Sequence, residues 1–338
     1  MSPWIYPCSS VFIRVPINLS LRVCCNLKFM EVIWKAKDFG RSFRNPVLTL
    51  GNFDGVHLGH QRIFRQVRQK AKETGGESIA YTFNPHPVQL LKPELGPFLL
   101  LPVEERLWLI GDLGIDVIIC AEFTREFASL GAEEFVRDIL HRQIGVRHVY
   151  VGQNTTFGRG REGSVAMLKE LGRRYGFTVE AVEPVEVGGT LISSSLIRKL
   201  VRQGDVREAA ELLGRRPFLI GEVIHGFGRG SKKLGFPTAN LKIDALLVPK
   251  PGIYVVWAVH KSETFPGVAN LGWNPTFHDQ KFSIEIHILN FDKDIYGEPL
   301  RVEFLERLRD EATFRGPEEL IAQIKKDVEQ ARKILGID

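Results

Sequence analysis

Two histidines in a glycine-containing stretch have the spacing of a phosphate-transfer site. The stretch reads GNFDGVHLGH and runs from Gly51 to His60. It follows the apolar run 47–50 and precedes an amphipathic run that begins at Gln61. Backbone N–H groups at a helix start have no partner within the helix, and the helix dipole favours an anion there. His57 and His60 could then donate hydrogen bonds to phosphate oxygens during transfer.

A second glycine-rich stretch, residues 226–240, reads GFGRGSKKLGFPTAN. Its backbone N–H groups could surround a nucleotide while its basic side chains offset phosphate charge. Thr238 and Asn240 supply oxygens of the kind that Mg2+ prefers. The spacing is not that of a Walker A loop. The stretch therefore predicts either a second nucleotide site or a flexible surface hairpin.

A third candidate is the carboxylate of Glu285, in the run FSIEIHI at residues 282–288. The run alternates, so its isoleucines share one face of a strand while Glu285 and His287 share the other. Such a glutamate is either an ordinary solvated residue or a general base.

Three further polar strings are candidates for ligand contacts. They are TFNPHP at 82–87, GQNTTFGRGR at 152–161 and ISSSLIR at 192–198. The two prolines around His86 restrict its backbone, and serines at a helix start are often only caps. Each string has a structural interpretation beside the functional one.

The elements that must position these residues change character along the chain. From Val47 to about Arg198, apolar runs alternate with helical periodicity, which predicts a doubly wound parallel sheet with ligands at the carboxyl ends of its strands. The expected strands are 47–50, 79–83, 117–121, 148–151 and 177–182. Because three of the polar strings follow strands directly, we expect residues 51–60, 82–87 and 152–161 to converge on one crevice.

After the linker Arg215-Arg216-Pro217 the pattern has period 2, with frequent glycine and proline, until about Pro317. This predicts an antiparallel β-barrel closed by a C-terminal helix. The apolar stripe of that helix is Leu320, Ile324, Val328, Ala331 and Leu335. We accordingly expect a first domain at 30–214 and a second at 217–338.

Composition excludes several classes of protein. The chain has 338 residues, 44% of them hydrophobic and 25% charged, as in ordinary globular proteins. Arg14, Arg22 and Lys28 supply three of the net charges of +5, because residues 1–29 contain no acidic residue. The nearly balanced remainder disfavours a general nucleic-acid binder. The sequence contains no run of 18 apolar residues, so we expect no membrane span.

Residues 1–29 differ from the rest of the chain. They contain three prolines and three of the four cysteines, so only Cys120 remains for the body of the protein. This cysteine usage favours a reducing, cytoplasmic location. A signal peptide is disfavoured, and a transit peptide is weakened by the prolines. We expect an unstructured extension, or sequence translated in error upstream of a true start at Met30.

Taken together, the strings resemble those of bacterial bifunctional riboflavin kinase/FAD synthetases from about Val47 to Leu335. The resemblance implies that the second domain converts riboflavin and ATP to FMN and ADP. It implies that the first converts FMN and ATP to FAD and pyrophosphate. Mg2+ would accompany ATP, and no tightly bound organic cofactor is implied. We expect no nucleic-acid or membrane partner, and a monomer or weak homo-oligomer.

The resemblance also assigns residues to roles. The implied catalytic residues are His57, His60 and Arg198 for adenylyl transfer and Glu285 as the kinase base. The implied ATP contacts are Gly51, Asn52, Phe53, Gly59, Ser194, Ser195, Gly228, Arg229, Gly230, Lys232 and Gly235. The implied flavin contacts are His86, Asn154, Arg161, Asn270, Arg309 and Phe314. The implied metal ligands are Thr238 and Asn240.

Two positions in the first domain depart from the family pattern. Asn154 stands where aspartate is common, and Ser195 replaces threonine. The first change removes a charge, whereas the second keeps the hydroxyl. One alternative is therefore a protein with a single activity, with the first domain inactive or retasked to another acceptor such as a pantetheine phosphate or a nicotinamide mononucleotide. A non-enzymatic flavin-binding or RNA-binding regulator is the alternative from another class.

Overall fold

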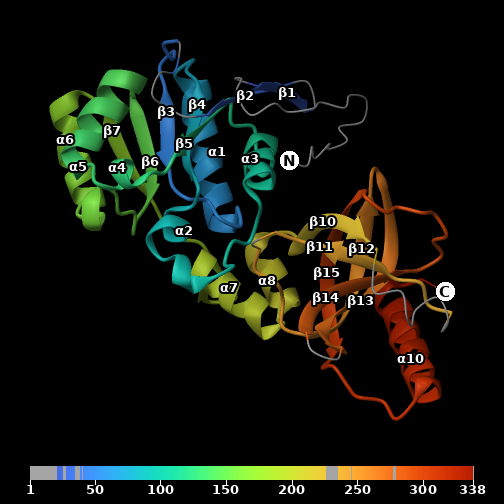
Figure 1. Cartoon of the computed structure of the whole chain (residues 1–338). Coiled ribbons are helices and arrows are strands. Elements are labelled where there is room, and N and C mark those ends of the chain that lie inside the picture. The colour runs from blue at the N-terminus through green and yellow to red at the C-terminus, as the bar shows by residue number, and fades with distance from the viewer. Residues whose placement is uncertain are drawn as a thin grey trace. The chain divides into compact units, whose positions relative to one another are not determined.

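The computed structural model describes residues 21–25, 28–34, 39, 41–225, 235–244, 246–276 and 279–337. Contacts divide them into two compact units. The sheet unit contains the described residues up to Gly96 and Leu101–Ser194. The barrel unit contains Pro97–Leu100 and the described residues from Ser195 onward. Figure 1 labels most of the helices and strands of both units.

The sheet unit is built on a seven-stranded sheet with the order β1-β2-β5-β4-β3-β6-β7. All neighbours are parallel except β1 and β2. The strands are β1 (Leu21–Cys25), β2 (Lys28–Trp34), β3 (Val47–Leu50), β4 (Ser78–Asn84), β5 (Val117–Glu122), β6 (His148–Gly152) and β7 (Thr178–Val182). The chain leaves β3 for β4 on one side and later returns to β6 on the other, so the strand order reverses beside β3. Ligands bind at such a point in doubly wound sheets, and the expected fold class is confirmed.

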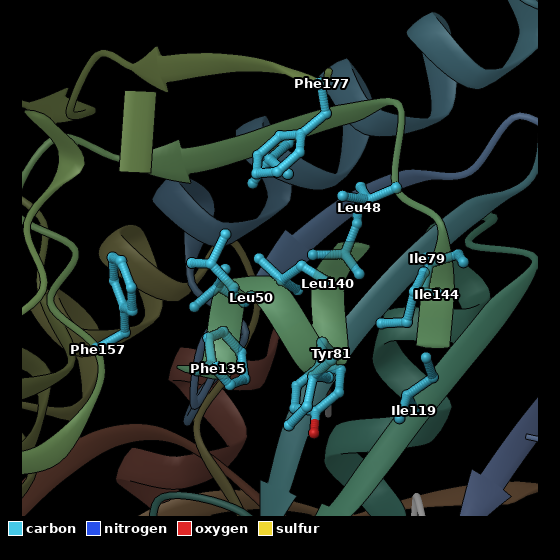
Figure 2. Close-up of a cluster of buried hydrophobic side chains, with 14 of the residues drawn as sticks. Leu48, Leu50, Ile79, Tyr81, Ile119, Phe135, Leu140, Ile144, Phe157 and Phe177 are labelled. Atoms are coloured by element: carbon cyan, nitrogen blue, oxygen red, sulfur yellow. The ribbon is translucent and has the colours of Figure 1, made fainter. Parts of the chain in front are cut away.

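The helices of this unit, of which the four longest bury apolar residues at helical spacing, follow in chain order. They are α1 (Leu58–Glu73), α2 (Pro87–Leu91), η1 (Pro93–Leu95), α3 (Val103–Asp112), α4 (Arg125–Ala128), α5 (Ala132–Glu134), η2 (Phe135–Ile144), η3 (Arg159–Arg161) and α6 (Val165–Tyr175). A short hairpin, β8 (Glu186–Val187) and β9 (Thr190–Leu191), follows β7. Figure 2 shows strand residues such as Leu48 and Ile79 packed with Phe135 and Leu140 of η2. In the part of the chain that the structure describes, no helix combines the length and apolarity needed to cross a membrane.

The first two strands were not expected. Leu21–Cys25 pairs with Lys28–Val32, so the expectation of an extension without structure at residues 1–29 does not hold for these residues. The reason lies in β2, where Val32 and Ile33 are buried beside β5. Because β2 extends the sheet, its other edge is left to pair with β1.

The barrel unit contains a closed antiparallel barrel with the order β10-β11-β14-β13-β12-β15. Its strands are β10 (Phe218–Ile224), β11 (Ala239–Lys242), β12 (Gly252–His260), β13 (Glu263–Thr276), β14 (Asp279–Ile288) and β15 (Pro299–Arg309). Alternate residues such as Ile284 and Ile286 fill the interior. The closing helix α10 (Pro317–Leu335) packs its Ala331 with Val255 and Val268 on the outer face. The expected barrel and closing helix are confirmed.

Two helices before the barrel belong to its unit, which places the division earlier in the chain than the expected boundary at 214–217. They are α7 (Ser194–Gln203) and α8 (Val206–Leu213). The N–H of Lys250 donates to the carbonyl of Val201 at 3.3 Å. Gly204, with φ +86°, lies so close to Arg307 that a Cβ there would be 2.6 Å from its Cδ. These contacts explain why the helices group with the barrel.

Candidate active sites

His57 and His60 lie together at the start of α1, directly after the loop that leaves β3. Their rings stack with centroids 3.6 Å apart and planes 19° apart. His57 is the N-cap of α1, and its Nδ1 accepts the backbone N–H of His60 at 3.3 Å. A neutral His57 therefore carries its proton on Nε2 and can donate it to an anion. Gly59 makes room for the stack, because a Cβ there would lie 3.1 Å from the His57 ring.

The loop before the histidines has an unusual backbone. Phe53 has φ +51° and Val56 has φ +41°, in the left-handed region that residues other than glycine rarely adopt. The loop is closed by the N–H of Val56, which donates to the carbonyl of Phe53 at 3.0 Å. The Phe53 ring packs on Phe64, with centroids 4.7 Å apart. Gly51 is needed beneath it, because a Cβ there would be 2.9 Å from that ring.

Ser194 and His86 are two further predicted residues with buried or partly buried positions in the sheet unit. The Ser194 hydroxyl donates to the carbonyl of Asp54 at 2.8 Å, so the structure brings this serine to the histidine loop. His86 is buried and caps α2, its Nδ1 accepting the N–H of Val88 at 3.1 Å.

Three predicted residues lie on exposed surface. Asn154 follows β6, and Arg161, also exposed, donates from Nε to the hydroxyl of Thr156 at 2.9 Å. Ser195 is exposed in the first turn of α7.

Arg198 lies in the barrel unit, on α7. Its Nε donates to the carbonyl of Phe98 at 3.0 Å, and its guanidinium lies 5.0 Å from the centre of the Phe98 ring. Both partners belong to the segment 97–100, which the contacts group with the barrel. The described contacts thus place Arg198 with Phe98.

Sequence reasoning missed Arg106, a charged residue that contacts the backbone of the histidine loop. It lies on α3 and is 3% exposed. Its Nη1 donates to the carbonyl of Asn52 at 2.9 Å. A signal was present, since Arg106 is adjacent to Leu107 and one helical turn from Ile110 on the buried side.

The barrel brings the predicted kinase residues into one row across its strands. Asn240 of β11 pairs with Glu285 of β14, which in turn pairs with Asn270 of β13. The row continues from Asn270 through Ile253 to Arg309. Paired residues of neighbouring strands share a face, and the strands are about 4.8 Å apart. Four predicted residues from separate parts of the sequence therefore lie in one row on the outside of the barrel, with Ile253 between Asn270 and Arg309.

The carboxylate of Glu285 has polar neighbours on that outer face. The Ser283 hydroxyl donates to Glu285 Oε1 at 3.3 Å. Gly272 is the register partner of Ser283, and the Glu311 carboxylate occupies the space where a side chain at Gly272 would lie. Nδ1 of His287 lies 2.9 Å from the carbonyl of Pro237, beside Thr238. The end of the glycine-rich stretch is thereby held against β14.

Arg309 connects the row to the closing helix. Its Nε and Nη2 donate to the two carboxylate oxygens of Asp327 at 3.0 and 2.7 Å. Its Nη1 donates to the carbonyl of Asp310 at 2.9 Å. Phe314 lies near the guanidinium, with 6.0 Å from Cζ to the ring centre. Asp327, 4% exposed, was missed because a single aspartate in an amphipathic helix usually faces water.

The predicted nucleotide contacts of the barrel are only partly within the described residues. Gly228, Arg229, Gly230 and Lys232 lie outside them. Gly235 is exposed and has φ +83°, a conformation that favours glycine.

Thr238 and Asn240 fit the predicted metal in chemical type, because a hydroxyl and an amide oxygen are hard oxygen donors that Mg2+ takes, and Asn240 is the register partner of Glu285.

Comparison with known proteins gives the same two parts. The family model described as FAD synthetase matches residues 41–196, and that described as riboflavin kinase matches residues 213–335. A bifunctional riboflavin kinase/FMN adenylyltransferase of Escherichia coli is 35% identical over 293 residues, covering 86% of this chain and 93% of that protein. One from Pseudomonas fluorescens is 39% identical over 306 residues, covering 90% and 98%.

A solved structure from Streptococcus pneumoniae, described as a macrolide-efflux protein, has a TM-score of 0.81 and 33% identity. It covers 89% of this chain and 98% of its own, so the arrangement of both folds along one chain recurs there. With two successive family models matched and relatives similar over nearly their full length, the chain belongs to the bifunctional riboflavin kinase/FMN adenylyltransferase family.

Proposed function

We propose that this protein makes FAD from riboflavin in two ATP-dependent steps, with each step carried out by its own unit. The observation that carries the proposal is that one chain contains both family domains, with His57 stacked on His60 in one and Asn240 paired with Glu285 in the other. The barrel unit phosphorylates riboflavin to FMN and releases ADP. The sheet unit adenylylates FMN to FAD and releases pyrophosphate.

In the kinase reaction, Glu285 acts as the base. It takes the proton of the ribityl hydroxyl while that oxygen forms a bond to the γ-phosphorus of ATP, and the bond to the β-phosphate oxygen breaks. Asn240 and Asn270 flank Glu285 in the strand register and orient the hydroxyl between them. Thr238 and Asn240 would hold Mg2+, which neutralises phosphate charge when bound. Phe314 and Arg309 border the flavin, and Gly228, Arg229, Gly230, Lys232 and Gly235 surround the nucleotide.

In the adenylyl transfer, no protein nucleophile is needed. An oxygen of the FMN phosphate attacks the α-phosphorus of ATP, and pyrophosphate leaves. His57 and His60 donate hydrogen bonds to the negative charge that builds on the phosphorus oxygens. The loop from Gly51 to Gly59 and the hydroxyl of Ser194 bind ATP. His86, Asn154 and Arg161 contact the flavin nucleotide.

The setting of the enzyme follows from its substrates and its charge. Riboflavin, FMN and ATP are small dissolved molecules, and the chain beyond residue 29 is nearly balanced in charge. We place the protein in the cytoplasm as a monomer or weak homo-oligomer that acts without a nucleic acid or a membrane.

Labelled ATP tests the two reactions separately. Phosphorus label in the γ-position should appear in FMN when riboflavin is the acceptor. Label in the α-position should appear in FAD when FMN is the acceptor. Label from the γ-position reaching FMN with none from the α-position reaching FAD would mean a riboflavin kinase with an inactive or retasked first domain. Bound flavin without transfer of either label would contradict both reactions.

A further inference from the structure

Arg106 is the most deeply buried cation near the histidine loop among the described residues. It lies on α3, about 50 positions along the chain from the loop that it contacts, and only 3% of it is exposed. Burying a guanidinium is costly unless its N–H groups are hydrogen-bonded. A buried arginine is therefore a feature that needs an explanation in terms of its partners.

Its partners are backbone carbonyls at the ends of two adjacent strands. Nη1 donates to the carbonyl of Asn52, two residues after β3, at 2.9 Å. Nη2 donates to the carbonyl of Phe83, near the end of β4, at 2.6 Å. The hydroxyl of Thr82 donates to the same Asn52 carbonyl at 3.3 Å. One planar side chain thus joins the strand ends from which the histidine loop and the His86 turn begin.

The orientation of the Asn52 carbonyl affects the backbone conformation of the residue that follows it. The next residue is Phe53, whose φ of +51° is unfavourable for a residue with a side chain. Such a conformation persists only where surrounding contacts determine it. The direction of the Asn52 carbonyl sets the peptide plane that enters Phe53, so a donor fixed at that oxygen selects the strained conformation.

The groups around Arg106 affect its pKa. Burial lowers its pKa below the ordinary value, while Cys120, Asp54 and Glu104 oppose that shift. Asp54 is 1% exposed and belongs to the histidine loop itself. A bidentate guanidinium satisfies two carbonyls in a fixed geometry, which the single flexible ammonium of a lysine cannot reproduce.

We propose that Arg106 is a positioning residue for adenylyl transfer. It holds the Asn52 carbonyl so that the loop carrying His57 and His60 keeps the shape that binds the ATP phosphates. This inference rests on the proposed assignment of that loop to ATP. Arg106 acts through the loop and needs no contact with the substrate.

The test is a set of variants assayed on the full-length protein for both activities. Arg106→Lys keeps the charge but leaves one carbonyl without its donor, and we expect the KM for ATP in adenylyl transfer to rise about tenfold. Arg106→Gln should raise it further, and Thr82→Val, which removes the weaker donor, should raise it about two- to threefold. Asp112→Asn, on the exposed end of the same helix, is the matched control and should change nothing.

Measuring KM and kcat separately distinguishes misplacement of the loop from a loss of folded protein. Misplacement of the loop raises the KM for ATP, and high ATP restores most of the rate. A lower fraction of folded protein would reduce kcat and leave KM unchanged, and that result for all three variants would contradict the inference. Riboflavin phosphorylation by the same preparations should stay at the wild-type rate.

His57→Ala shows which statement fails. If His57→Ala abolishes adenylyl transfer while Arg106→Lys and Arg106→Gln leave the KM for ATP unchanged, the role of Arg106 is wrong and the proposed function stands. If His57→Ala retains adenylyl transfer, the assignment of the loop is wrong and the inference loses its premise.

Discussion

The two candidate sites are built by different means. In the barrel unit, strand register alone places Asn240, Glu285 and Asn270 side by side. In the sheet unit, His57 and His60 sit on a loop whose backbone is strained at Phe53 and Val56. A ladder of backbone hydrogen bonds fixes the first site, whereas contacts from other parts of the fold fix the second.

The difference has consequences for mutation. A side chain in a registered row can be exchanged without moving its neighbours, because the ladder does not depend on it. A loop in a strained conformation depends on each of the contacts that determine it. We therefore expect that, within the row of Asn240, Glu285 and Asn270, a substitution impairs the kinase only through the substrate contact that it removes. Adenylyl-transfer defects should also arise at supporting residues.

The largest effect should come from Glu285, the proposed general base. Glu285→Gln keeps the shape but cannot accept the proton, and riboflavin phosphorylation should fall by about 10²- to 10⁴-fold. FMN adenylylation should stay unchanged. Glu263→Gln, at the exposed tip of the β12–β13 hairpin, is the control. Steady-state rates of FMN formation decide, and an unchanged rate in Glu285→Gln would remove Glu285 from its role.

The next effect should come from the histidine stack. His57→Ala and His57→Asn should each reduce FAD formation by about 10²- to 10³-fold, because both remove the imidazole donor. Only alanine also loses the N-cap of α1, which should lower the free energy of unfolding by about 1 kcal/mol. Rates combined with urea unfolding separate the two roles. Equal rates in wild type and His57→Asn would mean that the ring only caps the helix.

A third prediction concerns Arg309 and Asp327. If Arg309 supports the flavin site by holding α10, Arg309→Gln and Asp327→Asn should raise the KM for riboflavin to a similar extent. The double variant should then be little worse, with a coupling energy of about 1–3 kcal/mol. A large effect of Arg309→Gln with none for Asp327→Asn would instead indicate direct contact between Arg309 and the flavin.

A smaller effect should follow from crowding the histidines. Gly59→Ala would place a Cβ 3.1 Å from the His57 ring, so the ring must shift by a few tenths of an ångström. We expect FAD formation to fall several-fold with riboflavin phosphorylation unchanged. A wild-type rate of FAD formation would show that the ring position tolerates this shift.

The smallest effect concerns Cys120, which is buried on β5 in the interior of the sheet unit. Burial raises the pKa of Cys120 to about 12, so its thiol stays protonated at pH 8 and the thiolate that reacts with iodoacetamide is absent. Cys120 should remain unmodified in the folded protein and react after unfolding, as measured by peptide mass spectrometry. Rapid modification in the folded protein would mean that this interior opens readily.

Much of the fold follows from sequence pattern. Each of the five expected parallel strands is present to within two residues, because buried parallel strands are short apolar runs bounded by turns. The hairpin of β1 and β2 was missed, since its pairing depends on an edge that only the assembled sheet provides. The grouping of α7 and α8 with the barrel was also missed. It depends on contacts of Val201 and Gly204 that no local pattern encodes.

The sites were predictable to different depths. Alternation predicted the face of Glu285, but its register with Asn240 and Asn270 depends on how three strands pair. Arg106 and Asp327 were missed, because a charged residue in an amphipathic helix usually faces water. Both are buried only because the fold supplies partners from distant segments. The motif strings locate the chemistry, and the supporting residues have to be read from the structure.

The central claim is that one chain carries two separable reactions, and mixing two variants tests it most directly. Purified Glu285→Gln and His57→Ala are each incubated with riboflavin, ATP and Mg2+, alone and together, and the flavins are separated by chromatography. We predict little product from Glu285→Gln alone, FMN without FAD from His57→Ala alone, and FAD from the mixture. If either variant loses both reactions, or the mixture makes no FAD, the division of the two reactions between the two units is contradicted.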